Sequence, residues 1–267
     1  MDNRALFGMY FPGNSLIHRL DPRLKMVACF WFVVLVFFAH GWASNLLLIV
    51  LLLAVIRLSR VVFAKYWAGV RGLMGVILFT ALIQALFSSG GTVYWQWGIM
   101  AVTSAGLVQA VLLMLRFFLI ITGSTVITVT TTPLELADAI AALLKPLKVL
   151  HLPVNQLAMM LSIALRFVPT IMNEVTMIMN AQRARGVDFN SGSLLKRAKH
   201  LVPVLIPLFV AAFKRAEELA VAMEARGYDP NQPRTKYRQL HWQRRDSLAL
   251  AVLVFVTLAF IGLRIWE

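Results

Sequence analysis

The stretch L-L-L-I-V-L-L-L-A-V-I at positions 46–56 contains no polar side chain, and it is one of several apolar runs that decide the fold class. Hydrophobic residues make up 60% of the 267 residues, and charged residues only 14%. Runs that approach about 20 apolar residues are typical of helices that cross a bilayer core. The sequence therefore predicts an integral membrane protein of the all-α class, with its helices in a polytopic bundle.

Basic residues flank these apolar runs and predict the orientation of the chain. Four lie around the start of a first predicted span, residues 24–39: His18, Arg19, Arg23 and Lys25. Four more follow a second predicted span, which begins near residue 45: Arg57, Arg60, Lys65 and Arg71. Loops on the cytoplasmic side of a membrane carry an excess of Lys and Arg. We therefore expect a multi-pass protein with a cytoplasmic N-terminus. The net charge of +14 does not predict nucleic-acid binding, because basic flanks alone supply only nonspecific phosphate attraction.

The middle of the chain is harder to interpret. A third span, 72–87, leads into S-S-G-G-T-V-Y-W-Q-W-G at 88–98, whose glycines and aromatic residues are typical of a turn at the outer surface. The next apolar stretch, 99–131, is too long for one simple span and contains Arg116. One tilted helix and a span followed by a second buried segment both stay open. Arg116 either has a partner in the interior or lies near the membrane interface.

From position 133 the character of the chain changes. Residues 133–246 carry 16 Lys and Arg against 9 Asp and Glu, and their apolar positions form stripes, as in amphipathic helices at the cytoplasmic face. We predict helices at 133–150, capped by Thr132, at 153–186 and at 194–227, with Pro169, Pro203 and Pro207 kinking or dividing the last two. A final span follows at 247–264. The chain thus divides into N-terminal transmembrane helices (1–132), a cytoplasmic helical region (133–246) and a C-terminal transmembrane helix (247–267).

The two long amphipathic helices end in the same motif. N-A-Q-R-A-R-G-V-D at 180–188 and V-A-M-E-A-R-G-Y-D at 221–229 share the pattern A-x-x-A-R-G-x-D. A glycine that ends a helix, with a cation in the last turn, explains either copy by itself. Two matched copies favour a second interpretation, in which each Arg projects into a groove of a partner and engages a carboxylate or backbone carbonyls. Two equivalent projections predict a dimeric partner.

Nearly the whole chain resembles the transmembrane (T) components of energy-coupling factor (ECF) transporters, a branch of ABC-type importers of prokaryotes. The resemblance rests on S-L-I-H-R-L-D-P-R-L-K at 15–25, L-R-F-V-P-T-I-M-N-E at 165–174 and the two A-R-G ends in order. It implies that the long helices are coupling helices, which dock onto two cytoplasmic ATPases in a plasma-membrane importer. The implied docking residues are Ala184, Arg185 and Gly186 for one ATPase, and Ala225, Arg226 and Gly227 for the other.

The resemblance also implies a third partner, a membrane-embedded S component that binds the substrate, a vitamin or a transition-metal ion. Methionines on the second predicted amphipathic helix offer an adaptable surface for it: Met159, Met160, Met172, Met177 and Met179. Internal packing or contact with lipid explains these methionines equally well.

The sequence contains no constellation of catalytic residues. G-x-x-x-x-G-K-[ST], H-E-x-x-H and G-x-S-x-G do not occur, the five histidines are scattered, and Cys29 has no second cysteine to pair with. We therefore expect a subunit that is not an enzyme and binds no metal or cofactor, with ATP and Mg²⁺ held by the partner ATPases. The alternatives are a self-contained secondary carrier or an intramembrane enzyme. Both would require ionisable or catalytic groups within spans that are almost free of Asp and Glu.

Overall fold

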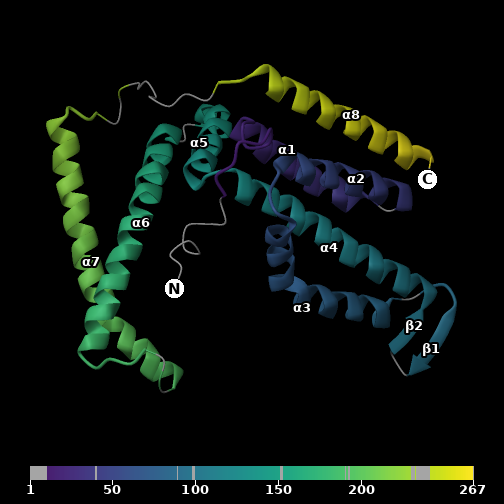
Figure 1. Ribbon diagram of the computed structural model, residues 1–267, viewed down its shortest axis with the longest axis horizontal. Coiled ribbons are helices and arrows are strands. Elements are labelled where there is room, and N and C mark those ends of the chain that lie inside the picture. The colour runs from purple at the N-terminus through teal and green to yellow at the C-terminus, as the bar shows by residue number, and fades with distance from the viewer. Residues whose placement is uncertain are drawn as a thin grey trace. The chain divides into compact units, whose positions relative to one another are not determined.

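The computed structural model describes residues 11–39, 41–88, 90–97, 100–150, 153–189, 191, 193–229, 232 and 241–266. The described chain is almost entirely helical, which confirms the all-α class (Figure 1). In chain order its elements are α1 (Pro22–Phe38), α2 (Trp42–Ser59), α3 (Phe63–Phe87), β1 (Val93–Trp97), β2 (Met100–Thr103), α4 (Ser104–Thr130), α5 (Pro133–Leu143), the 3-10 helix η2 (Lys145–Leu150), α6 (Val154–Ala184), α7 (Leu194–Ala225) and α8 (Arg244–Trp266).

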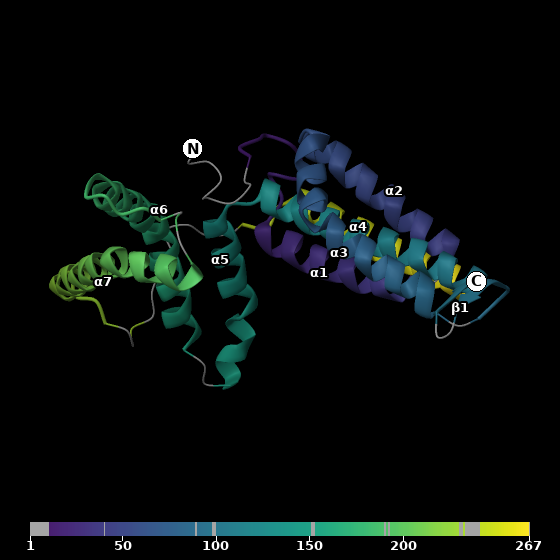
Figure 2. The ribbon, with the colours of Figure 1, turned by 90° about the horizontal axis from the view of Figure 1, so that it is seen from below.

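The chain forms two compact units. The first, which we call the bundle unit, comprises residues 8–139 and 240–267 and so contains α1 to α4, the β-hairpin, the start of α5 and α8. The second, which we call the long-helix unit, comprises residues 140–239 and contains α6 and α7. Within the bundle unit α4 packs against α1, α2 and α3, and α8 packs against α1 and α2 (Figure 2).

Five helices in the described part of the chain are long and apolar enough to cross a membrane: α2, α3, α4, Gln156–Ala184 of α6, and Arg244–Ile265 of α8. With 17 residues, α1 is shorter than these, at the lower end of the range for a span. The outer surface of the bundle unit carries large apolar side chains such as Phe30 and Phe255, each 71% exposed. Lipid covers such a surface in a multi-pass membrane protein.

The core of the bundle unit joins all of its long helices. Phe32 of α1, Leu48 of α2, Tyr66 of α3, Leu119 of α4 and Phe260 of α8 are buried in one cluster. Glycines allow the close approach: a Cβ atom at Gly123 would lie 2.9 Å from the Phe32 ring, and one at Gly69 would lie 3.0 Å from the Thr125 hydroxyl.

The structure decides between the two interpretations of 99–131. One helix of 27 residues, α4, covers most of it, and Arg116 has a partner. The Arg116 Nη2 atom donates to the carbonyl of Ala39, 3.0 Å away, which follows the last residue of α1. A helix end has unpaired carbonyls and a negative dipole, so a guanidinium there stabilises it.

The β-hairpin was missed in the sequence. β1 and β2 are antiparallel, with Trp95 opposite Val102 and Trp97 opposite Met100, so residues 100–103 are a strand and not the start of a span. The apolar M-A-V-T of β2 runs directly into α4, and for that reason the sequence shows no boundary there. Thr103 marks the change, because its hydroxyl accepts a hydrogen bond from the Gly106 amide and caps α4.

The first of the later helices is shorter than predicted. The predicted helix 133–150 ends at Leu143 and continues as a 3-10 helix, because Pro146 cannot donate and disfavours helical geometry in the residue before it. Its start is as predicted: the Thr132 hydroxyl accepts from the Glu135 amide, and the Glu135 carboxylate accepts from the Thr132 amide, which is a capping box.

The interior prolines do not divide α6 and α7, which are continuous over 31 and 32 residues. A proline at 207 leaves the carbonyl of residue 203 without its usual helical donor. The Gln182 side chain of α6 lies 3.5 Å from that carbonyl and offers a long replacement hydrogen bond. Packing between the two helices thus compensates for the break in the hydrogen-bond ladder of α7.

Candidate functional site

The first A-R-G end closes α6 with a Schellman motif. Arg185 is the last, half-helical residue, and Gly186 follows in the left-handed conformation with a φ of +88°. The Gly186 amide donates to the Arg183 carbonyl at 2.9 Å, and the Val187 amide donates to the Gln182 carbonyl at 3.0 Å. These two bonds satisfy carbonyls that the end of the helix would otherwise leave unpaired.

The second A-R-G end repeats this geometry at the end of α7. Arg226 has a φ of −88° against −84° for Arg185, and Gly227 has a φ of +69°. The Gly227 amide donates to the Glu224 carbonyl at 2.8 Å, and the Tyr228 amide donates to the Met223 carbonyl at 3.0 Å. The two copies of the motif therefore fold in the same way, as the helix-terminus interpretation requires.

Both ends are exposed. Ala184, Arg185 and Gly186 are exposed at the end of α6, as are Ala225, Arg226 and Gly227 at the end of α7. A Cβ atom built on either glycine would meet no atom within 4 Å. No hydrogen bond or ion pair joins the guanidinium of Arg185 or Arg226 to another described residue. The alanine and glycine beside each Arg leave its guanidinium accessible to a binding partner.

The residue two places before each arginine distinguishes the two ends. It is Arg183 at the end of α6 and Glu224 at the end of α7, and both side chains are exposed. Arg183 donates to the Asn180 side chain at 3.3 Å, and its guanidinium lies 5.9 Å from the centre of the Phe189 ring. The two ends thus have the same backbone conformation but differ in local charge.

An ion pair joins the two helices between their A-R-G ends. The Arg215 Nη1 atom of α7 lies 3.1 Å from the Glu174 Oε2 atom of α6, and its guanidinium also lies 5.8 Å from the centre of the Phe167 ring. Phe167 and Glu174 both belong to the L-R-F-V-P-T-I-M-N-E segment. Sequence reasoning noticed this segment but not its partner, because a single sequence does not show which residue of α7 faces it.

The methionines of α6 do not share one environment. Met160 and Met177 are 64% and 70% exposed, whereas Met159, Met172 and Met179 are half-buried. A more continuous exposed apolar surface lies on α7 and consists of Val202, Ile206, Phe209, Val210 and Phe213. The sequence analysis did not predict this surface. The helical spacing of 202, 206, 209 and 213 was the available signal.

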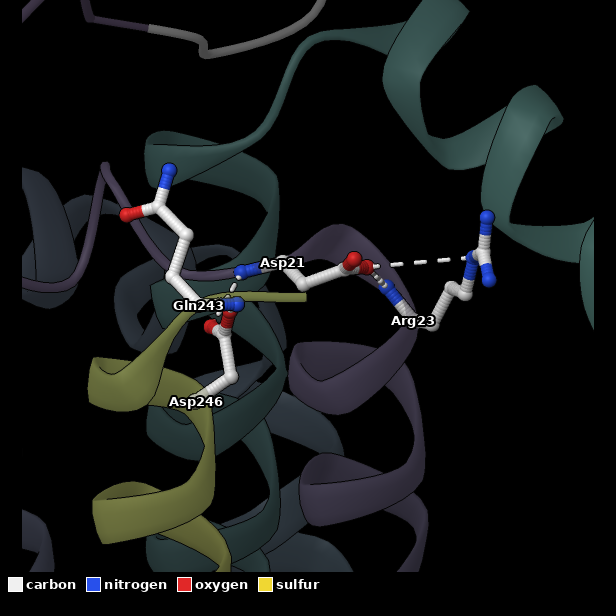
Figure 3. Close-up of polar contacts among 4 residues, drawn as sticks. All are labelled: Asp21, Arg23, Gln243 and Asp246. Carbon is white, nitrogen blue, oxygen red and sulfur yellow. Dashed lines mark hydrogen bonds and ion pairs between the residues drawn. The ribbon is translucent and has the colours of Figure 1, made fainter. Parts of the chain in front are cut away.

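A buried polar junction fixes one end of the bundle unit, where α1 and α8 both begin (Figure 3). The Asp246 carboxylate of α8 accepts from the Asp21 amide and from the Gln243 amide, each at 2.8 Å. The Asp21 carboxylate accepts from the Arg23 amide, also at 2.8 Å, and lies 4.0 Å from the Arg23 Nε atom. Asp21 and Asp246 are 6% and 1% exposed, so these bonds are made away from water.

Lys25 extends the junction to α4. Its ammonium donates to the His18 carbonyl at 3.2 Å, to the Thr130 carbonyl at 3.1 Å and to the Thr131 hydroxyl at 3.3 Å. All three donors of this buried ammonium are therefore used. In the described part of the chain no group of three or more His, Cys, Asp or Glu side chains could hold a metal ion.

Comparison with known proteins matches residues 13–237 to a family described as "CbiQ: Cobalt transport protein". Several curated proteins are similar over almost their whole length. The "Energy-coupling factor transporter transmembrane protein EcfT" of Limosilactobacillus fermentum is 60% identical, with 99% of both chains covered. Its namesake of Streptococcus equi is 50% identical over 95% of this chain and 94% of its own. That of Bacillus subtilis is 48% identical over 97% of this chain and 98% of its own.

Proposed function

Because the chain belongs to the family of energy-coupling factor transporter transmembrane proteins, we propose that it couples ATP hydrolysis by two cytoplasmic ATPase subunits to substrate uptake. The substrate, a vitamin or a transition-metal ion, would be bound by a separate membrane-embedded S component. The observation that carries this proposal is the pair of exposed A-R-G ends with the same backbone geometry.

Each end is suited to contact a carboxylate or carbonyl in a partner. A guanidinium presents donors in a planar fork, and the small flanking residues keep bulk away from it. The Schellman motif also fixes the backbone on both sides of each arginine, so little conformational entropy is lost on docking. We assign one ATPase to Ala184, Arg185 and Gly186, and the other to Ala225, Arg226 and Gly227.

The long helices would transmit the motion of the ATPases. As the ATPases close on nucleotide and open again, the distance between their two binding surfaces for Arg185 and Arg226 would change. This change would displace the ends of α6 and α7. The Glu174–Arg215 ion pair joins the helices between those ends. Because of this contact, displacement of one helix would also displace the other. Differential contacts in the closed and open states would supply the coupling free energy.

In this proposal the N-terminus and the long-helix unit lie on the cytoplasmic side, although α6 is apolar enough to cross a membrane. The membrane-embedded S component contacts exposed apolar side chains of the long helices. Met160 and Met177 of α6 are available for this contact, with Phe209 and Phe213 of α7. Substrate selection belongs to the S component and not to this chain.

Neither a secondary carrier nor an intramembrane enzyme is favoured by a specific observation. A proton- or ion-driven carrier uses ionisable groups within its spans. The sequences of α2, α3 and α4 contain no Asp or Glu. Of the other two candidate spans, α8 has one acidic residue, Asp246, with both carboxylate oxygens engaged at the polar junction, and α6 has one, Glu174, which forms an ion pair with Arg215.

The proposal is tested by capturing the full chain from its native membrane in mild detergent and identifying the proteins that come with it. We expect two ATPase subunits, recognised by their G-x-x-x-x-G-K-[ST] motifs, and one small membrane protein. Addition of ATP and Mg²⁺ to the captured complex should give hydrolysis, and the chain by itself should give none. Capture of the intact chain without any ATPase would contradict the proposal and favour the alternative function, a secondary carrier.

A further inference from the structure

An apolar cavity lies inside the bundle unit, at the end that carries the polar junction. Its volume is about 260 Å³, and its walls come from α1, α2, α4 and α8. On α1 it reaches from Leu24 to Phe32, a distance of about 12 Å along a helix. Other lining residues are Leu52 and Leu58 of α2, Gly123 of α4 and Ala249 of α8.

The cavity offers nothing to which water could bind. Lys25 and Thr130 line it, but the three donors of Lys25 are directed to protein oxygens, and the Thr130 hydroxyl donates to the Val126 carbonyl at 2.7 Å. A buried water needs about two to four polar partners, and cavities without them stay dry. An occupant of this cavity is therefore apolar.

The cavity reaches the surface of the bundle unit. Two of the residues that line it are exposed: Leu58, 47% exposed near the end of α2, and Val252, 54% exposed in α8. Both helices are apolar enough to cross a membrane, so the apolar molecules that surround them are lipids. A lipid chain can thus enter the cavity from the bilayer.

Five arginines lie close in sequence to residues that line the cavity. Arg19 adjoins the lining residue Leu20, and Arg57 and Arg60 stand on either side of Leu58. Arg244 and Arg245 lie one turn before Ala249, at the start of α8. All five side chains are exposed. Three acidic groups lie near this end: Asp21 and Asp246 are buried and already engaged, and Glu135 is half-buried and accepts from the Thr132 amide. The five exposed arginines outnumber these groups, so the surface at this end is positively charged.

From these observations we propose that the cavity is a binding site for an anionic phospholipid. One acyl chain fills the apolar space between α1, α2, α4 and α8, and the phosphate lies among the arginines of the entrance. Basic pockets between transmembrane helices bind anionic headgroups in this way, and charge-assisted hydrogen bonds from guanidinium groups favour phosphate. The proposal does not depend on the ATPase or S-component assignments.

The test is native mass spectrometry of the full chain from nanodiscs of equal parts phosphatidylglycerol and phosphatidylcholine. Ala249→Phe fills the cavity from α8, and Ala251→Phe adds the same bulk on the exposed side of α8, outside the cavity. We expect the wild-type chain and Ala251→Phe to retain one phosphatidylglycerol, favoured over phosphatidylcholine about tenfold. Ala249→Phe should retain at least tenfold less.

A second pair of variants tests the charge without altering the cavity, which matters if Ala249→Phe does not fold. Arg57→Gln with Arg60→Gln should lower the preference for phosphatidylglycerol at least threefold, whereas Arg71→Gln with Arg264→Gln should leave it unchanged. Equal retention of the two lipids by the wild-type chain would overturn the proposal. So would equal retention of phosphatidylglycerol by folded Ala249→Phe and Ala251→Phe.

Discussion

Glu174 of α6 and Arg215 of α7 form an ion pair at 3.1 Å, and each stands eleven residues before the arginine of an A-R-G end. Eleven residues of helix measure about 16 Å. The helices are antiparallel, because Gln182 lies beyond Glu174 in α6 while its partner Pro203 lies before Arg215 in α7. The ion pair is therefore midway between the two ends, which are about 33 Å apart along the helix direction if α6 and α7 are straight.

Glu174 and Arg215 should be energetically coupled. Their side chains are 23% and 29% exposed, which leaves the pair partly screened by solvent. We expect a double-mutant cycle of Glu174→Ala and Arg215→Ala to give about 0.5–1 kcal/mol of coupling in the free energy of unfolding, measured in mixed micelles. The reversed pair, Glu174→Arg with Arg215→Glu, should recover part of the loss of either single reversal. Additive effects of the two alanine substitutions would contradict the pairing.

Asp246 should be essential for the stability of the bundle unit. Asp246→Ala removes the acceptor of the buried Asp21 amide and of the Gln243 amide just before α8. An unsatisfied buried amide and a lost cap together cost about 2–4 kcal/mol of unfolding free energy. Glu217→Ala, at an exposed position of α7, is the control and should change stability by less than about 0.5 kcal/mol. Similar effects of the two substitutions on unfolding would show that the junction is not formed.

The glycines of the A-R-G ends should resist substitution for a reason of backbone conformation alone. Gly186 and Gly227 have positive φ but open space around them, so Gly186→Ala and Gly227→Ala should each destabilise by about 1–2 kcal/mol without a steric clash. Gly262 has equally open space but lies within α8, so Gly262→Ala should be neutral or stabilise by up to about 1 kcal/mol. Thermal unfolding of the three variants compares them, and the same sign for all three would contradict the assigned helix ends.

The predictions that succeeded from sequence rest on local signals. Apolar runs located α2, α3 and α8, T-T-P-L-E located the capped start of α5, and the two R-G pairs located the ends of α6 and α7. Each of these signals acts within a few residues of the feature that it specifies, so one sequence is enough to read it.

The features that sequence reasoning missed depend on contacts or on competing signals. Glu174 and Arg215 are 41 residues apart, and Asp21 and Asp246 are 225 residues apart, so nothing in a single chain marks them as partners. The hairpin was not predicted because the apolar residues of β2 resemble the start of a span. The docking role of the A-R-G ends stays a prediction, since a helix end has the same backbone conformation whether or not it binds a partner.

Direct measurement of ATPase binding tests the central claim. Purified full-length chain is titrated with its ATPase subunits, and stoichiometry and affinity are compared for the wild-type chain, Arg185→Glu, Arg226→Glu and the double variant. Lys214→Glu, at an exposed position in the middle of α7, is the matched charge reversal. We predict two ATPases per wild-type chain and per Lys214→Glu chain, one tightly held ATPase in each single variant, and a loss of affinity of at least 100-fold in the folded double variant. Undiminished binding of two ATPases by that double variant would show that the A-R-G ends are helix termini only.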